Sequence, residues 1–304
     1  MIPPVIYSNF SREKYVIARV PRKRLRFSRV VLTASIIVWL SIVYLPLYWM
    51  VITAFKLPIA ISRGATYIPW IDFMPSLAAW SEMFTGVQSL RISSAFRNGL
   101  AISFVSATLA VVFGTMAGFG LARFQYRFGR WRNNEIGFWF ISQRMMPPIA
   151  SVMAFLLMYK SLGLLDEHLG LILAYISFSV PLVIWIMRDY FAQIPVEMEE
   201  SALIEGASRL GSFFSITVPL ATPGLVTSFI LSFIFTWNEY LFALILTFEQ
   251  SVTVPLLLAS QVTSIGVQYW KMAVLSTLSL IPSSICAMVL SRYIERGLFS
   301  GAIK

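Results

Sequence analysis

The sequence has very few of the residues from which metal sites and disulfide frameworks are built. Its 304 residues include one cysteine, Cys286, and one histidine, His168. A single cysteine excludes an intramolecular disulfide, and the two residues together leave too few thiolate and imidazole ligands for a cysteine or histidine metal site. We therefore expect no metal site, and the same scarcity leaves an enzyme little side-chain chemistry to work with.

Charged residues are also scarce, whereas apolar residues dominate. Only 12% of the residues are charged and 58% are hydrophobic, and the mean hydropathy is +0.75, far outside the balance of soluble domains. The basic residues stand beside apolar runs instead of forming a stripe with interleaved stacking aromatics, which argues against a nucleic-acid partner. The sequence predicts an all-α membrane protein that crosses the bilayer several times.

Six apolar runs are long enough to cross a membrane, because a helix rises about 1.5 Å per residue and roughly 20 residues span the hydrocarbon core. The predicted spans are 30–55, 98–122, 136–159, 169–187, 221–247 and 272–291. The first exceeds the apolar region of a signal peptide, so we expect an uncleaved helix. In the second, Gly114, Gly118 and Gly120 would let a neighbouring helix approach closely.

The basic residues also predict orientation, since Lys and Arg beside a span are retained in the cytoplasm. With the N-terminus inside, seventeen of them flank the inner ends and six lie in outer segments. We therefore place both termini and residues 194–219 in the cytoplasm. The expected organisation is a basic cytoplasmic tail (1–29), a first transmembrane helix and outer loop (30–97), a core of five transmembrane helices (98–291) and a cytoplasmic tail (292–304).

The sequence allows two roles for each of two of these segments. The tail at 1–29 either only fixes the topology or also contacts membrane lipid headgroups. The outer loop at 56–97 is either a contact for an external partner or a lid without one.

The segment at 194–225, IPVEMEESALIEGASRLGSFFSITVPLATPGL, holds four of the chain's fourteen acidic residues within 197–205. Pro195 suits the first turn of a helix, where carboxylates favour the positive end of the helix dipole. Gly206 weakens the helix and marks a bend. We predict a short helix, a turn at Gly206, a second short helix through Phe214 and entry into the membrane at VPLATPG. We expect the small side chains to let another surface approach: Ser201, Ala202, Gly206 and Ala207. Composition alone also allows a solvated acidic loop that binds nothing.

The spacing within this segment resembles the EAA loop of ABC-importer permeases. That pattern reads E-A-A, three residues, G, nine residues, I-x-L-P, and here its positions are Glu200, Ser201, Ala202, Gly206, Ile216 and Pro219. The departures are Ser201 for the first Ala, Val218 for Leu, and Glu205 where Asp commonly precedes the Gly.

Further segments over about 96–304 are similar to the carbohydrate branch of these permeases, specifically the maltose-type second membrane subunit. They are RNGLAIS, GFGLARFQY, KSLGLLDEHLGLIL, FTWNEYLFALILT and RGLFSGAIK. The resemblance implies the ABC type I importer permease fold, in a bacterial inner membrane. It also implies a sugar or sugar-like solute, whose identity the sequence leaves open.

The resemblance further implies that the EAA loop is a coupling helix that fits a groove on a cytoplasmic ATPase. The coupling residues would be Glu200, Ser201, Ala202, Glu205, Gly206, Ile216 and Pro219, with tail contacts at Gly297, Gly301 and Lys304. The implied partners are a homologous permease subunit in a heterodimer, two ATP-binding subunits and an external solute-binding protein. No G-x-x-x-x-G-K-[ST] loop occurs, so we expect no cofactor bound by this chain, with ATP and Mg used by the partner subunits.

Two ionisable residues inside predicted spans, Arg144 and Glu239, are candidates for function because charge is unfavourable in hydrocarbon. Their depths differ by about 15 Å, so we do not expect them to pair. Gln143 to Pro148 predicts a kink, where Arg144 satisfies freed carbonyls, snorkels inward or contacts solute. An ion-coupled secondary transporter, with both residues in the coupling, is the alternative function.

The run Trp237-Asn238-Glu239-Tyr240 has the chemistry of a sugar site, with aromatic faces for C–H groups and polar groups for hydroxyls. Alternatively, Asn238 and Glu239 bond a neighbouring helix and the aromatics lie at the membrane interface.

Overall fold

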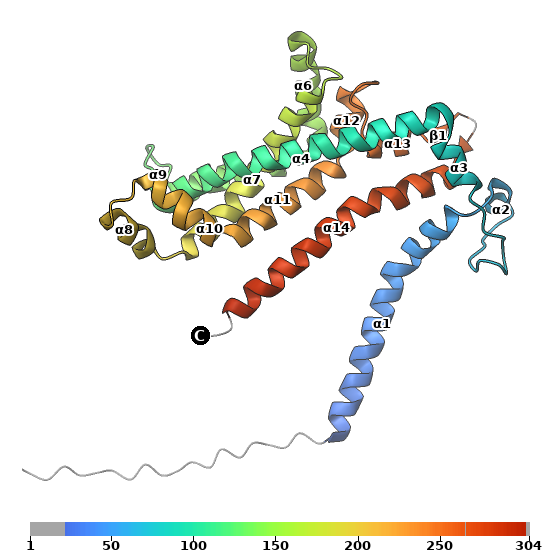
Figure 1. Ribbon diagram of the computed structural model, residues 1–304, viewed down its shortest axis with the longest axis horizontal. Coiled ribbons are helices and arrows are strands. Elements are labelled where there is room, and N and C mark those ends of the chain that lie inside the picture. Colours follow the sequence, from blue (N-terminus) through green and yellow to red (C-terminus); the bar gives the residue numbers. More distant parts are fainter. Residues whose placement is uncertain (1–21, 265, 302–304) are drawn as a thin grey trace, which may run out of the picture. The chain divides into compact units, whose positions relative to one another are not determined.

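The computed structural model describes residues 22–264 and 266–301, most of which are helical (Figure 1). The chain divides into two compact units, Met1–Trp49 and Met50–Lys304. The described part of the first unit belongs to one helix, α1 (Arg22–Thr53), whose side chains from 30 to 49 are all exposed. A helix that is apolar and exposed all round suits a lipid environment. α1 begins inside the expected basic tail, of which residues 1–21 lie outside the described part.

The second unit is built on long helices: α4 (Gly86–Arg123), α7 (His168–Gln193), α11 (Thr222–Trp237) and α14 (Tyr269–Gly301). α4 packs most extensively against α7. A Cβ added at Gly114 would lie 2.6 Å from Val183, and one at Gly118 would lie 3.0 Å from the backbone nitrogen of Arg188. The expected close helix packing at these two glycines is confirmed.

α4 is longer than the hydropathy predicted. It begins at Gly86, so residues 86–97, expected in the outer loop, are helical. The apolar run is interrupted there by Arg91 and Arg97, but no proline or glycine lies between Gly86 and Asn98 to end a helix. The rest of the expected loop contains two short helices, α2 (Pro58–Ser62) and α3 (Ala78–Phe84).

Two spans are bent pairs of helices. α5 (Asn133–Ser142) and the 3₁₀ turn η1 (Gln143–Met145) meet α6 (Pro148–Leu162) at 87°. The helical stretch Arg209–Leu220 meets α11 at 73°. Within the described residues, four helices are long and apolar enough to cross a membrane, and six spans result if each bent pair is one span. This arrangement supports the expected all-α membrane fold.

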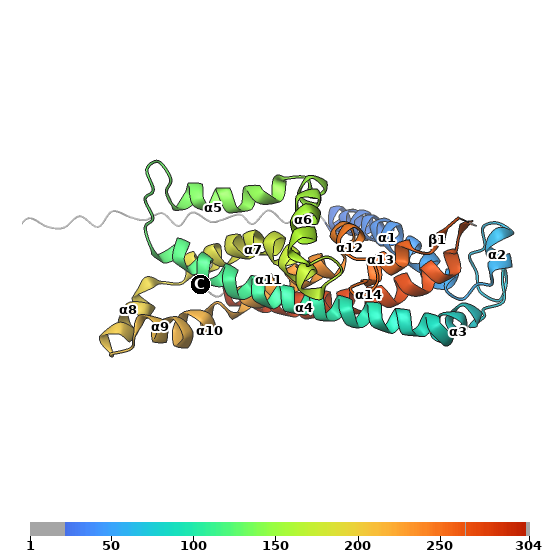
Figure 2. The same cartoon turned by 90° about the horizontal axis from the view of Figure 1, so that it is seen from above.

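The shorter elements complete the second unit. They are α8 (Val196–Ile204), α9 (Arg209–Ser212), the π-helix η2 (Phe213–Thr217), α10 (Val218–Leu220), α12 (Leu241–Leu246), α13 (Val254–Ala259) and the antiparallel strands β1 (Val262–Thr263) and β2 (Gly266–Val267). α8, α9 and α10 gather where α4 and α7 end, which we call the EAA end, whereas α3 lies at the opposite end, where α4 begins (Figure 2). Gly297 and Gly301 lie in the last turns of α14, and Lys304 lies outside the described residues.

Candidate functional site

The EAA segment, residues 194–219, forms a helix, a turn and a second helix, as predicted. α8 follows Pro195, whose missing N–H would have no intrahelical partner at a helix start. Glu197 and Glu199 lie in its first turn, at the positive end of the helix dipole. The second helix is capped by Ser208, whose Oγ accepts a hydrogen bond from Gly211 N–H at 3.0 Å. It continues through η2 and α10, further than the predicted end at Phe214.

The turn between the two helices depends on Gly206. Its φ is +93°, a backbone conformation that residues with a Cβ rarely adopt, although a Cβ there would have open space around it. Gly206 N–H donates to the carbonyl of Leu203 at 3.1 Å, and Ala207 N–H donates to that of Ala202 at 2.9 Å. This pair of hydrogen bonds is the Schellman motif, which ends α8 and satisfies two of its last carbonyls.

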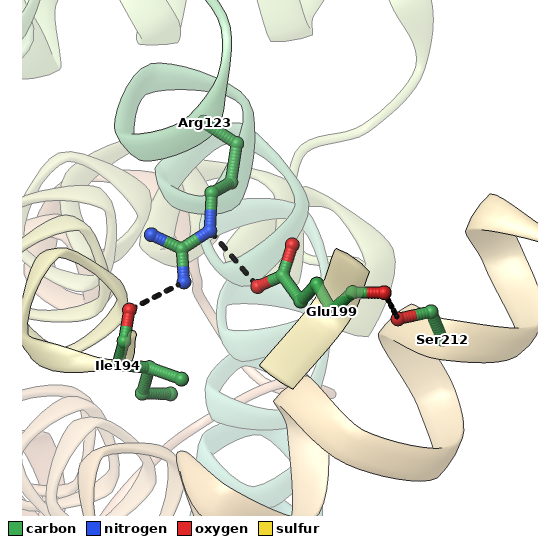
Figure 3. Close-up of polar contacts among 4 residues, drawn as sticks. All are labelled: Arg123, Ile194, Glu199 and Ser212. Carbon is green, nitrogen blue, oxygen red and sulfur yellow. Dashed lines mark hydrogen bonds and ion pairs between the residues drawn. The ribbon is translucent and has the colours of Figure 1, made fainter. Parts of the chain in front are cut away.

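Arg123, in the last turn of α4, anchors the EAA segment to the long helices (Figure 3). Its Nε donates to Glu199 Oε1 at 2.9 Å, and a terminal guanidinium nitrogen donates to the carbonyl of Ile194 at 2.9 Å. The Arg123 and Glu199 side chains are only 8% and 14% exposed, so solvent screens this ion pair less than a surface pair. The start of α8 is thereby fixed to the end of α4.

Phe213 provides a second attachment, through packing. Its ring centroid lies 4.6 Å from that of Phe119 on α4 and 6.3 Å from that of Phe191 on α7. Phe213 is 8% exposed and Phe191 is fully buried. The carbonyl of Glu199 also accepts a hydrogen bond from Ser212 Oγ at 3.5 Å. Both helices of the EAA segment are thus attached to the ends of α4 and α7.

The EAA segment exposes acidic and apolar side chains, together with Arg209 and three serines. Glu200 and Glu205 are exposed, and the most exposed of its large apolar side chains are Ile204 at 87%, Leu210 at 71% and Phe214 at 65%. Large apolar groups left in solvent on a well-formed segment are typical of protein contact sites. Pro219 is exposed as well, and Ile216 is half-buried.

Of the small residues of the motif, Ala202 is buried and Ser201 is exposed. Ala202 is 7% exposed and faces its own chain, where α8 packs against α9 and η2. Ser201 Oγ donates back to the carbonyl of Glu197 at 2.8 Å. The small size of Ala202 therefore serves packing within this chain, because a larger side chain would push α8 away from η2.

The Trp237-to-Tyr240 run lies where the fifth span breaks between α11 and α12. Trp237 is 1% exposed and donates from Nε1 to the carbonyl of Ser279 on α14 at 3.1 Å. Its ring packs beside Phe96 and Phe233, so it does not lie at an interface and presents no open face to a solute. Asn238 Nδ2 donates to the carbonyl of Ile234 at 2.8 Å.

Glu239 is used within the chain to stabilise this break. Its carboxylate accepts hydrogen bonds from Tyr175 Oη on α7 at 3.0 Å and from the backbone N–H of Phe242 at 3.0 Å. For Glu239, the alternative of a bond to a neighbouring helix is confirmed. The Glu239 carboxylate also caps the start of α12, whose first N–H groups would otherwise have no partner in the membrane.

Arg144 lies in η1, at the predicted kink, which is confirmed by the 87° bend. Its guanidinium carbon lies 4.7 Å from the ring centroid of Phe235. No ion pair joins it to Glu239 in the described part of the chain, as the difference in depth predicted.

A polar cluster at the start of α7, which is the end of the α4–α7 pair away from the EAA segment, was not predicted. Asp166, at φ +59°, accepts hydrogen bonds from four successive backbone N–H groups, those of residues 248–251, at 3.0 to 3.1 Å. Burial raises the pKa of Asp166, but these four donors outweigh it and hold the pKa below its usual value. We call this the Asp166 clasp.

The clasp is extended by Asn98 of α4 and His168 of α7. Asn98 Nδ2 donates to the carbonyls of Gln250 and Val252 at 2.7 and 3.2 Å, and His168 Nε2 lies 3.0 Å from Asn98 Oδ1. Across residues 22–264 and 266–301, no group of three or more His, Cys, Asp or Glu side chains is placed to hold a metal ion. The role of these polar groups is to fix the 248–253 loop.

Comparison with known proteins identifies the family. Residues 110–300 match the family described as binding-protein-dependent transport system inner membrane component. The chain belongs to this family. It is 35% identical over 70% of its length to the trehalose transport system permease protein SugB of Mycobacterium tuberculosis (strain CDC 1551 / Oshkosh), covering 77% of that protein. The resemblance to ABC-importer permeases of the carbohydrate branch is confirmed.

Solved structures show the same fold. A bacterial ABC transporter involved in the import of the acidic polysaccharide alginate matches with a TM-score of 0.73 at 21% identity, over 90% of this chain and 98% of that chain. A bacterial alginate ABC transporter in complex with an alginate pentasaccharide-bound periplasmic protein matches with a TM-score of 0.61 at 15% identity, over 89% and 93%. The family match and the apolar helices together make the chain a multi-pass inner-membrane permease.

Proposed function

We propose that this chain is one of two transmembrane subunits of an ATP-driven importer for a sugar or sugar-like solute. In this proposal a homologous permease subunit completes the translocation pathway, two ATP-binding subunits supply energy and an external solute-binding protein delivers the solute. The family description, which names binding-protein-dependent transport, supports the external partner. The trehalose system of the SugB relative supports a sugar.

The EAA segment carries this proposal. It leaves Ile204, Leu210 and Phe214 in solvent, while Arg123 and Phe213 tie it to the ends of α4 and α7. An ATPase subunit that bound the exposed residues and moved on ATP binding would pull the long helices with it, because the attachment is rigid. The acidic Glu200 and Glu205 would favour a basic rim on that subunit.

ATP and Mg would be used by the partner subunits, since this chain has no phosphate-binding loop. The chain would thus be a non-catalytic subunit with no cofactor of its own. The end of α14, with Gly297 and Gly301, would give the ATPase a second contact. With both termini in the cytoplasm, as the basic residues predict, this contact and the EAA segment would lie on the same side of the membrane.

A charge placed on the exposed residues tests the proposal. Ile204→Asp should abolish uptake and solute-stimulated ATP hydrolysis by the reconstituted transporter, because the carboxylate would be buried against the ATPase subunit. Ile204→Met keeps an apolar side chain of similar volume and should retain most of both activities. Normal ATP-driven uptake by the Ile204→Asp transporter would contradict the assignment.

The ion-coupled alternative requires Glu239 as a coupling residue, whereas the structure gives this side chain a structural role. The carboxylate is engaged by Tyr175 and by the start of α12, and Arg144 lies apart from it. Vesicle uptake separates the two functions: uptake by the importer survives collapse of ion gradients and stops without ATP, whereas an ion-coupled transporter does the reverse.

A further inference from the structure

The bend in the third span borders a cleft of about 200 Å³ between η1, α6 and α7. Its lining combines one cation, three uncharged polar side chains and two aromatic rings: Arg144, Gln143, Ser151, Ser177, Phe155 and Phe178. The cleft lies inside the region that crosses the membrane, and the solute pathway of the proposed function must pass through that region.

Arg144 has no anion from its own chain. In the described part of the chain it forms no ion pair or hydrogen bond, and its guanidinium carbon makes a cation–π contact with the Phe235 ring, 4.7 Å from the centroid. Glu239, the other intramembrane ionisable residue, is engaged by Tyr175 and Phe242. A guanidinium in this setting is unfavourable unless an anion reaches it, and its planar fork of donors matches a carboxylate.

We propose that this cleft binds the carboxylate of an acidic sugar, such as a uronic acid, through Arg144. This inference rests on the proposed function and specifies its solute. One guanidinium balances one negative charge, which fits a carboxylate better than a doubly charged phosphate monoester.

The other lining groups fit the rest of a sugar ring. Ser177 Oγ donates to the carbonyl of Leu173 at 2.9 Å and keeps lone pairs for a solute hydroxyl. The rings of Phe155 and Phe178 pack against Phe242 and also line the cleft, where their remaining surface would contact sugar C–H groups. The cleft is smaller than the roughly 300–1,000 Å³ of small-molecule sites, so it holds one end of the solute and the second permease subunit would cover the remainder.

Uptake of matched sugars tests the inference in the complete transporter, reconstituted in vesicles with its binding protein. Each acidic probe is compared with a neutral counterpart. D-glucuronate is paired with D-glucose and D-galacturonate with D-galactose, and the disaccharides of these four sugars are tested in the same pairs. We expect ATP-dependent uptake of at least one acidic probe to exceed that of its neutral counterpart. Arg144→Gln should lower that uptake roughly 10- to 100-fold, as loss of a charge-assisted hydrogen bond implies, with Arg144→Lys in between. Lys160→Gln, which removes a cation from the other end of α6, should leave it unchanged.

Three results would overturn the inference. The first is ATP-driven uptake of neutral probes alone, and the second is uptake of acidic probes that Arg144→Gln leaves unchanged. The third is dissociation of the two permease subunits in that variant, because it would assign Arg144 to a contact between subunits. Binding of the same probes to the purified complex separates this inference from the proposed function. Arg144-dependent binding of an acidic probe that is taken up without ATP would support the site and overturn the ATP-driven importer. Failure of every acidic probe to bind would overturn the site alone.

Discussion

The two ends of the α4–α7 pair hold their loops in different ways. At the opposite end, the Asp166 clasp fixes the 248–253 loop by accepting hydrogen bonds from four backbone N–H groups, and Asn98 donates to two backbone carbonyls of the same loop. At the EAA end, the attachment is one shielded ion pair, one packed phenylalanine and a few single hydrogen bonds. The clasp holds the shape of a loop, whereas the EAA attachments join a preformed helical unit to the ends of two helices. Under the proposed function, the EAA segment would therefore move as a unit together with these helix ends.

The largest effect should follow from breaking the turn that makes the EAA segment one unit. Gly206→Val places a β-branched side chain at φ +93°, a strain of about 1–3 kcal/mol that changes how α8 ends. We expect ATP-driven uptake to be lost while the subunits stay assembled. Asn tolerates left-handed conformations better than Val, so Gly206→Asn should retain measurable uptake. Equal uptake by the two variants would show that the turn conformation is not required.

The Arg123 anchor should matter next. Arg123→Gln leaves the largely shielded Glu199 without its cation, and we expect a loss of about 3 kcal/mol in the local stability of the EAA segment, measured by hydrogen exchange of α8 amides. The double variant Arg123→Gln, Glu199→Gln removes both charges and should recover part of this loss. Strictly additive effects would contradict the ion pair.

At the opposite end, Asp166→Asn should lower the free energy of unfolding by about 2 kcal/mol, because an amide oxygen is a weaker acceptor for the four N–H groups. Asn also tolerates the positive φ of this position, so the change isolates the charge. Thermal unfolding of the purified complex measures the loss. ATP hydrolysis per assembled complex should be unchanged. ATP hydrolysis that no longer depended on solute in this variant would show that the two ends do not differ in their role.

The clasp also predicts a pH dependence. The four donors hold the pKa of Asp166 below its usual value, after burial has raised it. Its stabilisation is therefore fully present above the unfolded pKa of about 3.9 and is lost as pH falls through the lower folded pKa. In thermal unfolding from pH 7 to pH 3, the difference between wild type and Asp166→Asn should begin to narrow below about pH 4. A difference that stayed constant over this range would contradict the assignment.

The smallest effect should come from an exposed ion pair. Lys271 Nζ lies 2.5 Å from Glu82 Oε1, with the Glu82 side chain 53% exposed. Lys271→Gln should change the free energy of unfolding by less than about 1 kcal/mol, as measured by thermal unfolding. A loss as large as that of Arg123→Gln would show that burial does not distinguish the two pairs.

Local signals in the sequence predicted much of the fold and of the EAA segment. Pro195 and Gly206 predicted where α8 starts and ends, and Pro147 and Pro148 predicted the bend in the third span. These are effects of single residues on their own backbone, so they can be seen without a structure. The break after Trp237 has no proline or glycine, and the polar Asn238 and Glu239 that stand there do not show by themselves that the helix ends.

The anchors could not be predicted because they join distant residues. Arg123 and Glu199 are 76 positions apart, and Asp166 is 82 to 85 positions from the N–H groups it binds. In the sequence Arg123 is one of the basic residues that predict topology, and nothing near it points to Glu199. The size of Ala202 alone does not show whether its own chain or another subunit packs against it, and in the structure its own chain buries it.

Site-specific photo-crosslinking in the assembled transporter tests most directly the claim that the EAA segment is the ATPase contact. A photoreactive amino acid replaces Leu210, which is 71% exposed at the EAA end, or Phe248, which is 67% exposed beside the clasp. The account predicts a crosslink to the ATPase subunit from position 210 and none from position 248. A crosslink from position 248, or its absence at position 210 in a complex that hydrolyses ATP, would contradict it.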